Sequence, residues 1–140
     1  MTFVIDASVA LKWFIEEDLT NQALLFRHGT DPLYAPDLIF AEIANAVWRK
    51  FTRRELPREQ AMAIPVLLQE SPIEIIPVAL LHQRALEIAI ELNHPVYDCL
   101  YLACAELAGA VLVTADGRLI QAVQASEYAR LTRRLANLSK

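Results

Sequence analysis

The chain has 140 residues, of which 55% are apolar and 21% are charged. That length suits one domain, and the apolar fraction is high enough for a compact core, so extensive disorder is excluded. The formal net charge is −4, from 13 basic and 17 acidic residues. An acidic balance argues mildly against a protein whose whole surface binds nucleic acid.

Several other classes are excluded by what the sequence lacks. Only three glycines occur, whereas Gly-rich dinucleotide and phosphate loops need several close together. The longest run without a formal charge has ten residues and contains Pro65, so we expect no membrane-spanning helix, which needs about 20 apolar residues. The N-terminus does not resemble a secretory signal. Cys99 and Cys104 match neither a zinc nor a redox spacing, and we expect two buried thiols in a cytoplasmic protein.

The first half of the chain predicts two strands and four helices. Short apolar runs at 3–5 and 33–35 are typical of buried strands. Asp18 and Asp37 are candidate N-caps for two of the helices. Pro65 is expected to kink or interrupt the last of them, because proline lacks an N–H and clashes with the preceding turn. The predicted helices cover 8–15, 18–28, 37–54 and a segment that starts at Pro57.

The second half continues the alternation of strands and helices. Residues 110–114 (AVLVT) form the clearest strand pattern in the chain, and 73–77 is a weaker one. For the ambiguous last fifteen residues we favour a short strand near 128–132. The predicted helices cover 80–92, 97–107 and 117–125.

This alternation predicts the fold class. The strand runs are apolar throughout rather than alternating, which indicates a parallel sheet that is buried on both faces. We therefore expect one α/β domain over residues 1–140, with a central, mostly parallel sheet of four to five strands flanked by helices.

Two acidic residues lie where an α/β sheet places its ligands. Asp6 ends the first predicted strand, and Asp116 follows the 110–114 strand almost directly. Ligands of such sheets bind beyond the carboxyl ends of the strands. Each aspartate also precedes a predicted helix, so a capping role is the structural alternative for both.

Two further acids lie in apolar helical segments. Glu42 is next to the apolar stripe of its helix, and Asp98 lies in a segment with no basic residue between Glu87 and Arg118. A carboxylate near a core is unfavourable unless it is paired or bound to a cation. For Glu42 the alternative is a side chain that extends to solvent.

Four acids from four segments predict a cation site if they converge. Clustered carboxylates repel one another without a counter-ion, and Mg²⁺ or Mn²⁺ suits a site that offers only oxygen ligands. The chemistry implied is metal-assisted attack of water on a phosphodiester. The three histidines are scattered, and we interpret each as a surface or packing residue: His28, His82 and His94.

The basic residues are concentrated in one short stretch. Residues 49–58 carry five basic side chains against Glu55 alone, a balance of +4, whereas residues 1–48 have a balance of −5. A solvated helix end and a surface that contacts RNA phosphates are both compatible with this pattern. The candidate RNA contacts are Arg49, Arg53, Arg54 and Arg58.

Three stretches resemble the PIN-domain ribonucleases, and more narrowly the VapC-like toxins of toxin–antitoxin pairs. Residues 4–11 (VIDASVAL) resemble the opening strand, acid and hydroxyl residue of that family. Residues 40–47 (FAEIANAV) resemble the helix that bears its second acid. Residues 97–103 (YDCLYLA), followed by 112–116 (LVTAD), resemble the segments with the third and fourth acids, and this pair is the most specific signal.

The resemblance implies an activity, a site and partners. It implies a Mg²⁺- or Mn²⁺-dependent endoribonuclease that is the toxin of a type II toxin–antitoxin system. Ser8 and Thr114 would orient carboxylates or water through hydrogen bonds. A cognate antitoxin and a homodimer are the expected partners, with no membrane partner. The four metal ligands and catalytic residues it implies are Asp6, Glu42, Asp98 and Asp116.

Two other functions remain open. The first is a metal-dependent phosphatase or phosphotransfer enzyme of another α/β fold, with Asp6 as nucleophile, although Ser8 occupies the position where haloacid-dehalogenase-like enzymes have a second acid. The second is a catalytically idle PIN-like scaffold that only binds RNA or protein. Three aromatics, Trp13, Trp48 and Phe51, are either exposed at a dimer interface or part of the core.

Overall fold

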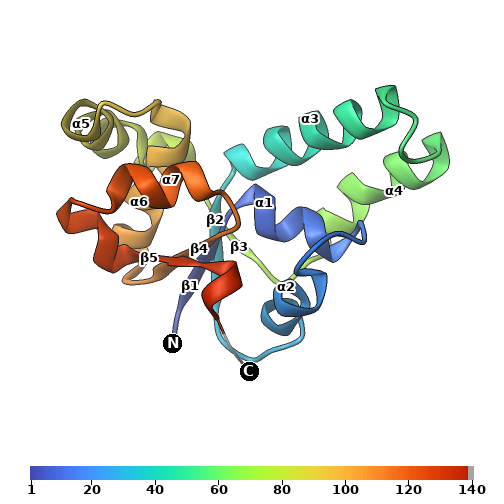
Figure 1. Cartoon of the computed structure of the whole chain (residues 1–140), viewed down its shortest axis with the longest axis horizontal. Helices are drawn as coiled ribbons and strands as arrows, with labels where there is room; N and C mark the ends of the chain where they lie inside the picture. The colour runs from blue at the N-terminus through green and yellow to red at the C-terminus, as the bar shows by residue number, and fades with distance from the viewer. Residues whose placement is uncertain (139–140) are drawn as a thin grey trace.

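Five strands form one sheet in which every neighbouring pair is parallel. The computed structural model describes residues 1–138 (Figure 1). The order across the sheet is β3-β2-β1-β4-β5, which confirms the predicted α/β domain. The strands are β1 (Phe3–Ile5), β2 (Leu33–Pro36), β3 (Glu74–Ile76), β4 (Val111–Thr114) and β5 (Thr132–Arg134).

Helices cover both faces of this sheet. The α-helices are α1 (Ala7–Ala10), α2 (Thr20–Arg27), α3 (Leu38–Thr52), α4 (Arg58–Gln69), α5 (His82–Leu92), α6 (Val96–Ala108) and α7 (Gly117–Val123). Short 3₁₀ helices cover Leu11–Trp13, Val78–Leu80, Glu127–Leu131 and Leu135–Asn137.

Alternate residues of the central strands pack into two cores on opposite faces. Ile5 of β1 and Val113 of β4 join the core beneath α1 to α4. Val4 and Leu112, one residue earlier on the same strands, join the core beneath α5, α6 and α7. Because successive side chains of a strand point to opposite faces, both faces must be covered, which explains the uniformly apolar strand runs.

The first two helix predictions are partly wrong. The segment predicted as one helix over 8–15 is the four-residue α1 followed by the 3₁₀ helix Leu11–Trp13. Asp18 is not an N-cap, because α2 begins at Thr20 after Leu19, whose φ of 67° breaks the helical path. The Thr20 hydroxyl instead accepts a hydrogen bond from the Glu17 N–H at 2.9 Å.

Two later predictions also need correction. Helix α4 runs without interruption through Pro65, which is exposed, so the predicted break is wrong. The proline removes only the N–H that would donate to the carbonyl of Ala61, one turn earlier in the helix. Residues 127–131 form a 3₁₀ helix, and the last strand begins at Thr132 rather than near Tyr128. Tyr128 and Leu131 are both buried and are one 3₁₀ turn apart, a spacing that suits the helix and not a strand.

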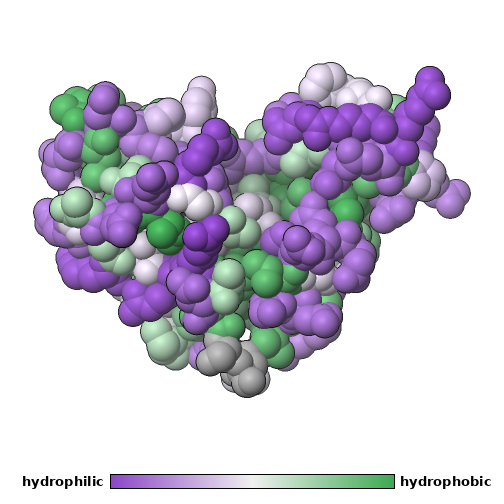
Figure 2. Space-filling model, viewed as in Figure 1, coloured by the Kyte–Doolittle hydropathy of each residue, from purple (hydrophilic) through white to green (hydrophobic). Residues whose placement is uncertain are grey.

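The strand order places a topological switch point between β1 and β4. The chain builds β1, β2 and β3 on one side and then returns to add β4 and β5 on the other. In open parallel sheets the ligand crevice lies at such a point, beyond the carboxyl ends of the strands. Figure 2 shows the molecule hollowed at this end, between α7 and α3. Within residues 1–138, no helix has the length and apolarity needed to cross a membrane.

Candidate active site

One pocket of about 430 Å³ lies at the switch point and brings all four predicted acids together. Ser8, Tyr101 and three charged side chains from α3 and the segment after α1 also line it. The first and last of these acids, Asp6 and Asp116, are more than 100 positions apart in the chain. The four predicted acids that line the pocket, together with Glu17, are Asp6, Glu42, Asp98 and Asp116.

Asp6 is held by the turn between β1 and α1. Its Oδ1 accepts hydrogen bonds from the Ser8 hydroxyl at 2.6 Å and from the Val9 N–H at 3.2 Å. The Ser8 hydroxyl in turn accepts from the Ala115 N–H at 3.0 Å, which ties the β1 turn to the β4 turn. Asp6 is therefore both the N-cap of α1 and a pocket residue, so its capping role does not exclude it from the pocket.

Asp116 occupies the equivalent turn after β4. Its Oδ1 accepts a hydrogen bond from the Arg118 N–H at 2.9 Å and caps α7. The Asp116 N–H donates to the hydroxyl of Thr114 at 2.9 Å. Because Thr114 is fully buried, this bond fixes the turn from inside.

Glu42 reaches the pocket from α3. Its carboxylate is half-buried and does not extend freely to solvent, because Oε1 accepts a 2.6 Å hydrogen bond from the Tyr101 hydroxyl of α6. Tyr101 is only 2% exposed. This hydrogen bond therefore links α6 to α3, which cover opposite faces of the sheet.

Asp98 lies in the first turn of α6 and contacts His94. The Nε2 atom of His94 is 2.7 Å from Asp98 Oδ2. His94 follows Asn93, which has a left-handed conformation with φ 51° at the end of α5. The prediction that His94 is only a surface or packing residue is wrong, because its ring contacts a carboxylate of the pocket.

Burial and mutual repulsion raise the pKa values of two of these acids. Burial raises the pKa of Asp6 to about 6, an effect that the hydroxyls of Ser8 and Thr114 oppose and the charge of Asp98 reinforces. Burial also raises the pKa of Glu42, with the Tyr101 hydrogen bond acting against it and Asp98 adding to it. The chain thus holds negative charge in a partly desolvated space, a condition that a bound cation relieves.

The basic side chains at the pocket differ in how strongly they are paired. Lys12 is 3.2 Å from Glu17, which also pairs with Lys50 at 2.9 Å. Arg49 is exposed and lines the same pocket. The other three arginines of the basic stretch, Arg53, Arg54 and Arg58, are exposed but do not line this pocket.

The residues present fit a hard divalent cation. Glu42, Asp98 and Asp116 each place one oxygen in a hydrogen bond, while the other accepts none from residues 1–138. Oxygen donors of this kind suit Mg²⁺ or Mn²⁺. In that same part of the chain, no three acidic, histidine or cysteine side chains form a closed ligand set. The four carboxylates line one pocket, so their free oxygens are available to a cation bound there.

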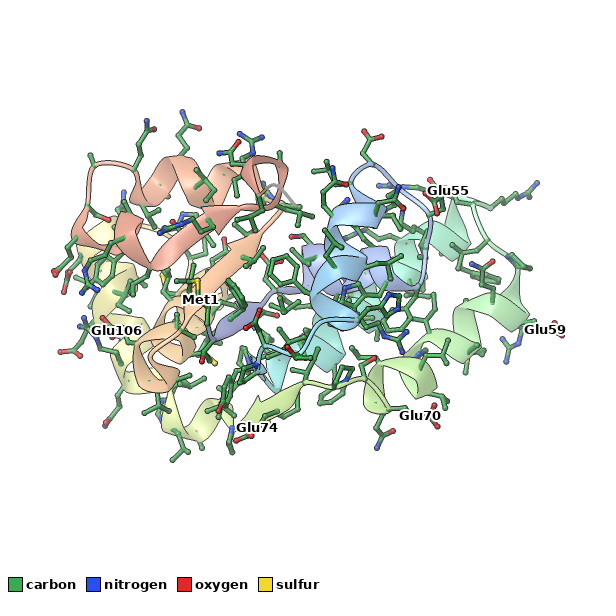
Figure 3. The ribbon with its side chains drawn as sticks, turned by 90° about the horizontal axis from the view of Figure 1, so that it is seen from below. Met1, Glu55, Glu59, Glu70, Glu74 and Glu106 are labelled. Atoms are coloured by element: carbon green, nitrogen blue, oxygen red, sulfur yellow. The ribbon has the colours of Figure 1, made fainter. Side chains whose placement is uncertain are left out.

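Several other acids of the chain lie outside the pocket, whereas Glu17, which pairs with Lys12 and Lys50, also lines it. Seen from below in Figure 3, Met1 lies near the middle of the view, at the amino end of the sheet opposite the pocket. The labelled glutamates lie around the periphery: Glu55, Glu59, Glu70, Glu74 and Glu106. None of these five glutamates lines the pocket, in contrast to the four predicted acids and Glu17.

Fold and site together define an α/β protein with an acidic pocket at the switch point of a parallel sheet. The sequence matches the PIN domain family over residues 3–124. Since that match spans most of the chain, the protein belongs to the PIN-domain family, as the resemblance predicted.

Curated relatives and a solved structure agree with this assignment. Ribonuclease VapC3 from Pyrobaculum aerophilum is 28% identical over 123 residues, which cover 86% of this chain and 94% of that protein. Ribonuclease VapC9 from Mycobacterium tuberculosis is 31% identical over 122 residues, which cover 87% and 91%. A toxin–antitoxin complex from Klebsiella pneumoniae contains a chain of similar fold, with a TM-score of 0.69, 14% identity, and coverage of 96% of this chain and 98% of that one.

Two residues that contact pocket carboxylates were not predicted from the sequence. They are Tyr101 of α6 and His94, which lies just before that helix. Tyr101 follows Asp98 by three positions and His94 precedes it by four. The first spacing places Tyr101 on the Asp98 face of α6, whereas His94 lies just before that helix begins at Val96. That periodicity was the available signal, whereas the pairing of Tyr101 with Glu42 on another helix had none.

Proposed function

We propose that this chain is a Mg²⁺- or Mn²⁺-dependent endoribonuclease and the toxin of a type II toxin–antitoxin pair. The observation that carries the proposal is the convergence of four carboxylates from β1, α3, α6 and β4 on one pocket of a PIN domain. The curated relatives named as VapC ribonucleases support RNA as the substrate class.

The side chains of the pocket have distinct roles in this proposal. Asp6, Glu42, Asp98 and Asp116 would hold the cation, which supplies an acidified water and neutralises charge on the phosphate. Ser8 orients Asp6, Tyr101 orients Glu42 and His94 orients Asp98 through the hydrogen bonds described above. Thr114 fixes the turn that carries Asp116. Such supporting bonds restrict the carboxylates to orientations compatible with binding.

The substrate would approach along the basic side of the pocket. Arg49 is the residue of the basic stretch that lines the pocket, so it is the first candidate for a phosphate contact. We propose that Arg53, Arg54 and Arg58 contact phosphates further along the RNA, beyond the end of α3. Arginine suits this role because its planar guanidinium makes paired hydrogen bonds to phosphate.

Protein partners and location follow from the same proposal. The solved toxin–antitoxin complex of similar fold supports a small cognate antitoxin. A homodimer and a cytoplasmic location complete the proposal; the two free, buried thiols of Cys99 and Cys104 agree with a reducing compartment. The phosphotransfer alternative has weaker support, because Ser8 already donates its hydroxyl to Asp6 and no acid occupies that position.

The decisive variant is Asp98→Asn, with Asp18→Asn as its matched control. Asp98→Asn removes one pocket charge at nearly constant volume, whereas Asp18 is exposed and outside the pocket. We expect Asp98→Asn to abolish cleavage of RNA in Mn²⁺ and to leave the metal-free protein at least as stable as the parent. Mn²⁺ at a hundredfold excess over its dissociation constant should stabilise the parent by about 2.7 kcal/mol. The Asp98 variant should gain clearly less.

Calorimetric melting of the three proteins in EDTA and in Mn²⁺, beside an RNA cleavage assay, measures these outcomes. If the parent cleaves RNA equally well in EDTA, the metal mechanism is wrong. If the parent binds Mn²⁺ but cleaves neither RNA nor a phosphomonoester, the idle scaffold is the better description. Phosphatase activity without RNA cleavage would favour the phosphotransfer alternative.

A further inference from the structure

A second groove, which the proposed function does not use, lies beside the acidic pocket. It has a volume of about 520 Å³ and lies between α7 and the segment that contains β5. We name it the β5 groove. The polar side chains and the glycine that line it include Gly117, Gln121, Gln124, Arg133, Arg134 and Asn137.

The charge of the β5 groove is opposite to that of the protein as a whole. Residues 117–138 carry four arginines against Glu127 alone, a balance of +3 in a chain of net charge −4. Among residues 1–138, no carboxylate lines the groove. Arg133 and Arg134 are exposed, and neither forms an ion pair with any residue from 1 to 138. Neither cation is neutralised by a carboxylate of these residues, and Arg133 donates one hydrogen bond, from Nη1 to the Thr132 carbonyl at 2.9 Å.

The sheet register places this charge next to the proposed cleavage site. Arg134 pairs with Thr114 between the parallel strands β5 and β4, two residues before Asp116. Its guanidinium lies against Gly117, where an added Cβ would be 3.3 Å from Nη2. Gly117 lines the β5 groove and Asp116 lines the acidic pocket. The two hollows thus meet at the Asp116–Gly117 peptide. This is the α7 side of the acidic pocket, whereas Arg49 lines the pocket from α3.

The composition of the groove suits a nucleic-acid strand. Guanidinium groups bind phosphate, and the amides of Gln121, Gln124 and Asn137 can bond sugars, phosphates or base edges. A strand that is cut in the acidic pocket must leave it on both sides of the scissile phosphate. Arg49 provides cationic charge at the α3 wall, and the β5 groove provides it at the α7 wall.

We propose that the β5 groove binds the phosphate backbone of the RNA strand on the α7 side of the cleavage site, with Arg133 and Arg134 as its contacts. This inference rests on the proposed ribonuclease function and adds the path of the substrate. Because the contacts are to phosphates, they would strengthen binding without selecting a base sequence.

The test compares Arg133→Gln and Arg134→Gln with Arg130→Gln. All three variants remove one charge from an exposed arginine of the same segment, but Arg130 does not line the groove. Binding of a fluorescently labelled single-stranded RNA of 20 nucleotides is measured in EDTA over a range of salt concentrations, and the melting temperature of each variant confirms folding. We expect the slope of log affinity against log salt to fall by about 0.7 for each groove arginine removed, and to stay unchanged for Arg130→Gln.

Cleavage by the same proteins in Mn²⁺ separates this inference from the proposed function. We expect Arg133→Gln and Arg134→Gln to raise KM with little change in kcat. If the parent cleaves RNA and both groove variants bind it like Arg130→Gln, the groove inference is overturned and the ribonuclease proposal stands. If the parent neither binds nor cleaves RNA, both fail. Unchanged RNA binding with loss of affinity for an acidic peptide would assign the groove to a protein partner and would also overturn the inference.

Discussion

At the scale of single residues, the site depends on which hydrogen-bond donor each carboxylate meets. Tyr101 is the most constrained donor, because it is almost fully buried and its only side-chain acceptor within residues 1–138 is Glu42. Burial and the charge of Glu42 raise the pKa of Tyr101 well above its ordinary value. The phenol therefore stays protonated at neutral pH and always presents a hydrogen to Glu42.

Removal of that hydroxyl provides a test with a matched control. Tyr101→Phe keeps the ring and releases Glu42, so we expect a 10- to 100-fold loss of Mn²⁺ affinity or kcat, on the order seen when residues that support metal ligands are changed. Tyr128→Phe removes the hydroxyl of another buried tyrosine, which donates to Glu91 at 2.7 Å and accepts from Arg84 at 3.1 Å, outside the pocket. That control should lose about 1 kcal/mol of stability, as for other partly exposed hydrogen bonds, and keep its activity.

The two variants are compared by calorimetric Mn²⁺ titration and by cleavage kinetics at saturating RNA. Equal metal affinity and equal kcat in Tyr101→Phe and the parent would mean that Tyr101 only packs α6 against α3. A similar loss of activity in Tyr128→Phe would point to a general effect of stability.

At the scale of elements, a charged network joins the segment after α1 to the end of α3. Glu17 lies 3.2 Å from Lys12 and 2.9 Å from Lys50, and all three side chains are mostly buried. Burial alone would raise the pKa of Glu17, but the hydrogen bonds and charges of Lys50 and Lys12 outweigh it and lower the pKa below its ordinary value. The network therefore stabilises the fold while Glu17 is ionised.

The pH dependence of this network can be predicted with its sign. A lowered pKa in the folded protein means that the unfolded chain binds the proton more readily, so stability is present above the unfolded pKa of 4.5 and is lost as pH falls through the folded value. We expect Glu17→Gln to be less stable than the parent by about 1 kcal/mol at pH 7. This difference should shrink below about pH 4.

Urea unfolding from pH 3 to pH 7 measures the difference, with Glu16→Gln as the control. Glu16 is the exposed neighbour and forms no ion pair within residues 1–138. A difference between Glu17→Gln and the parent that stays constant over the whole pH range would show that the network contributes through packing and not through charge.

At the scale of the whole molecule, an apolar surface on the α3–α4 pair suits the proposed homodimer. Trp48 is 59% exposed, and with Phe51 and Met62 it lines a predominantly apolar hollow between the two helices. Trp13, the third aromatic considered from the sequence, is buried instead and donates its indole N–H to the Ala23 carbonyl at 2.8 Å. Exposed apolar patches of this kind mark protein interfaces.

A charge placed in this surface should prevent self-association. We expect Trp48→Glu to convert a dimer to a monomer, because a buried, unpaired carboxylate is strongly unfavourable in an interface. Ile90→Glu is the control, since Ile90 is also highly exposed but lies on α5. Light scattering after size-exclusion chromatography gives the masses. A parent that is monomeric at all concentrations would contradict the homodimer, and equal masses for both variants would place the interface elsewhere.

The sequence alone determined the alternation of elements, the parallel sheet and the four acids. The strands at 3–5, 33–35 and 110–114 were predictable because a strand buried on both faces must be apolar at every position. The position of Asp6 and Asp116 at the pocket was predictable because parallel strands end at one edge of the sheet. The sequence was less informative where one side chain could bond either of two groups, such as its own helix or a distant segment. Asp37 precedes α3 as predicted, yet its carboxylate accepts the Val78 N–H at 2.9 Å instead of capping that helix.

Only the tertiary structure decided which side chains meet across elements. Tyr101 is 59 positions from Glu42, and Arg134 lies beside Gly117 because β5 pairs with β4 in one particular register. The sequence showed the arginines near the C-terminus without indicating what they face. Contacts between distant segments depend on strand order, register and helix packing, which are set by the summed packing of both cores. Periodicity along the chain reports which face of an element is buried, but it carries no information about the residue on the other side of the contact.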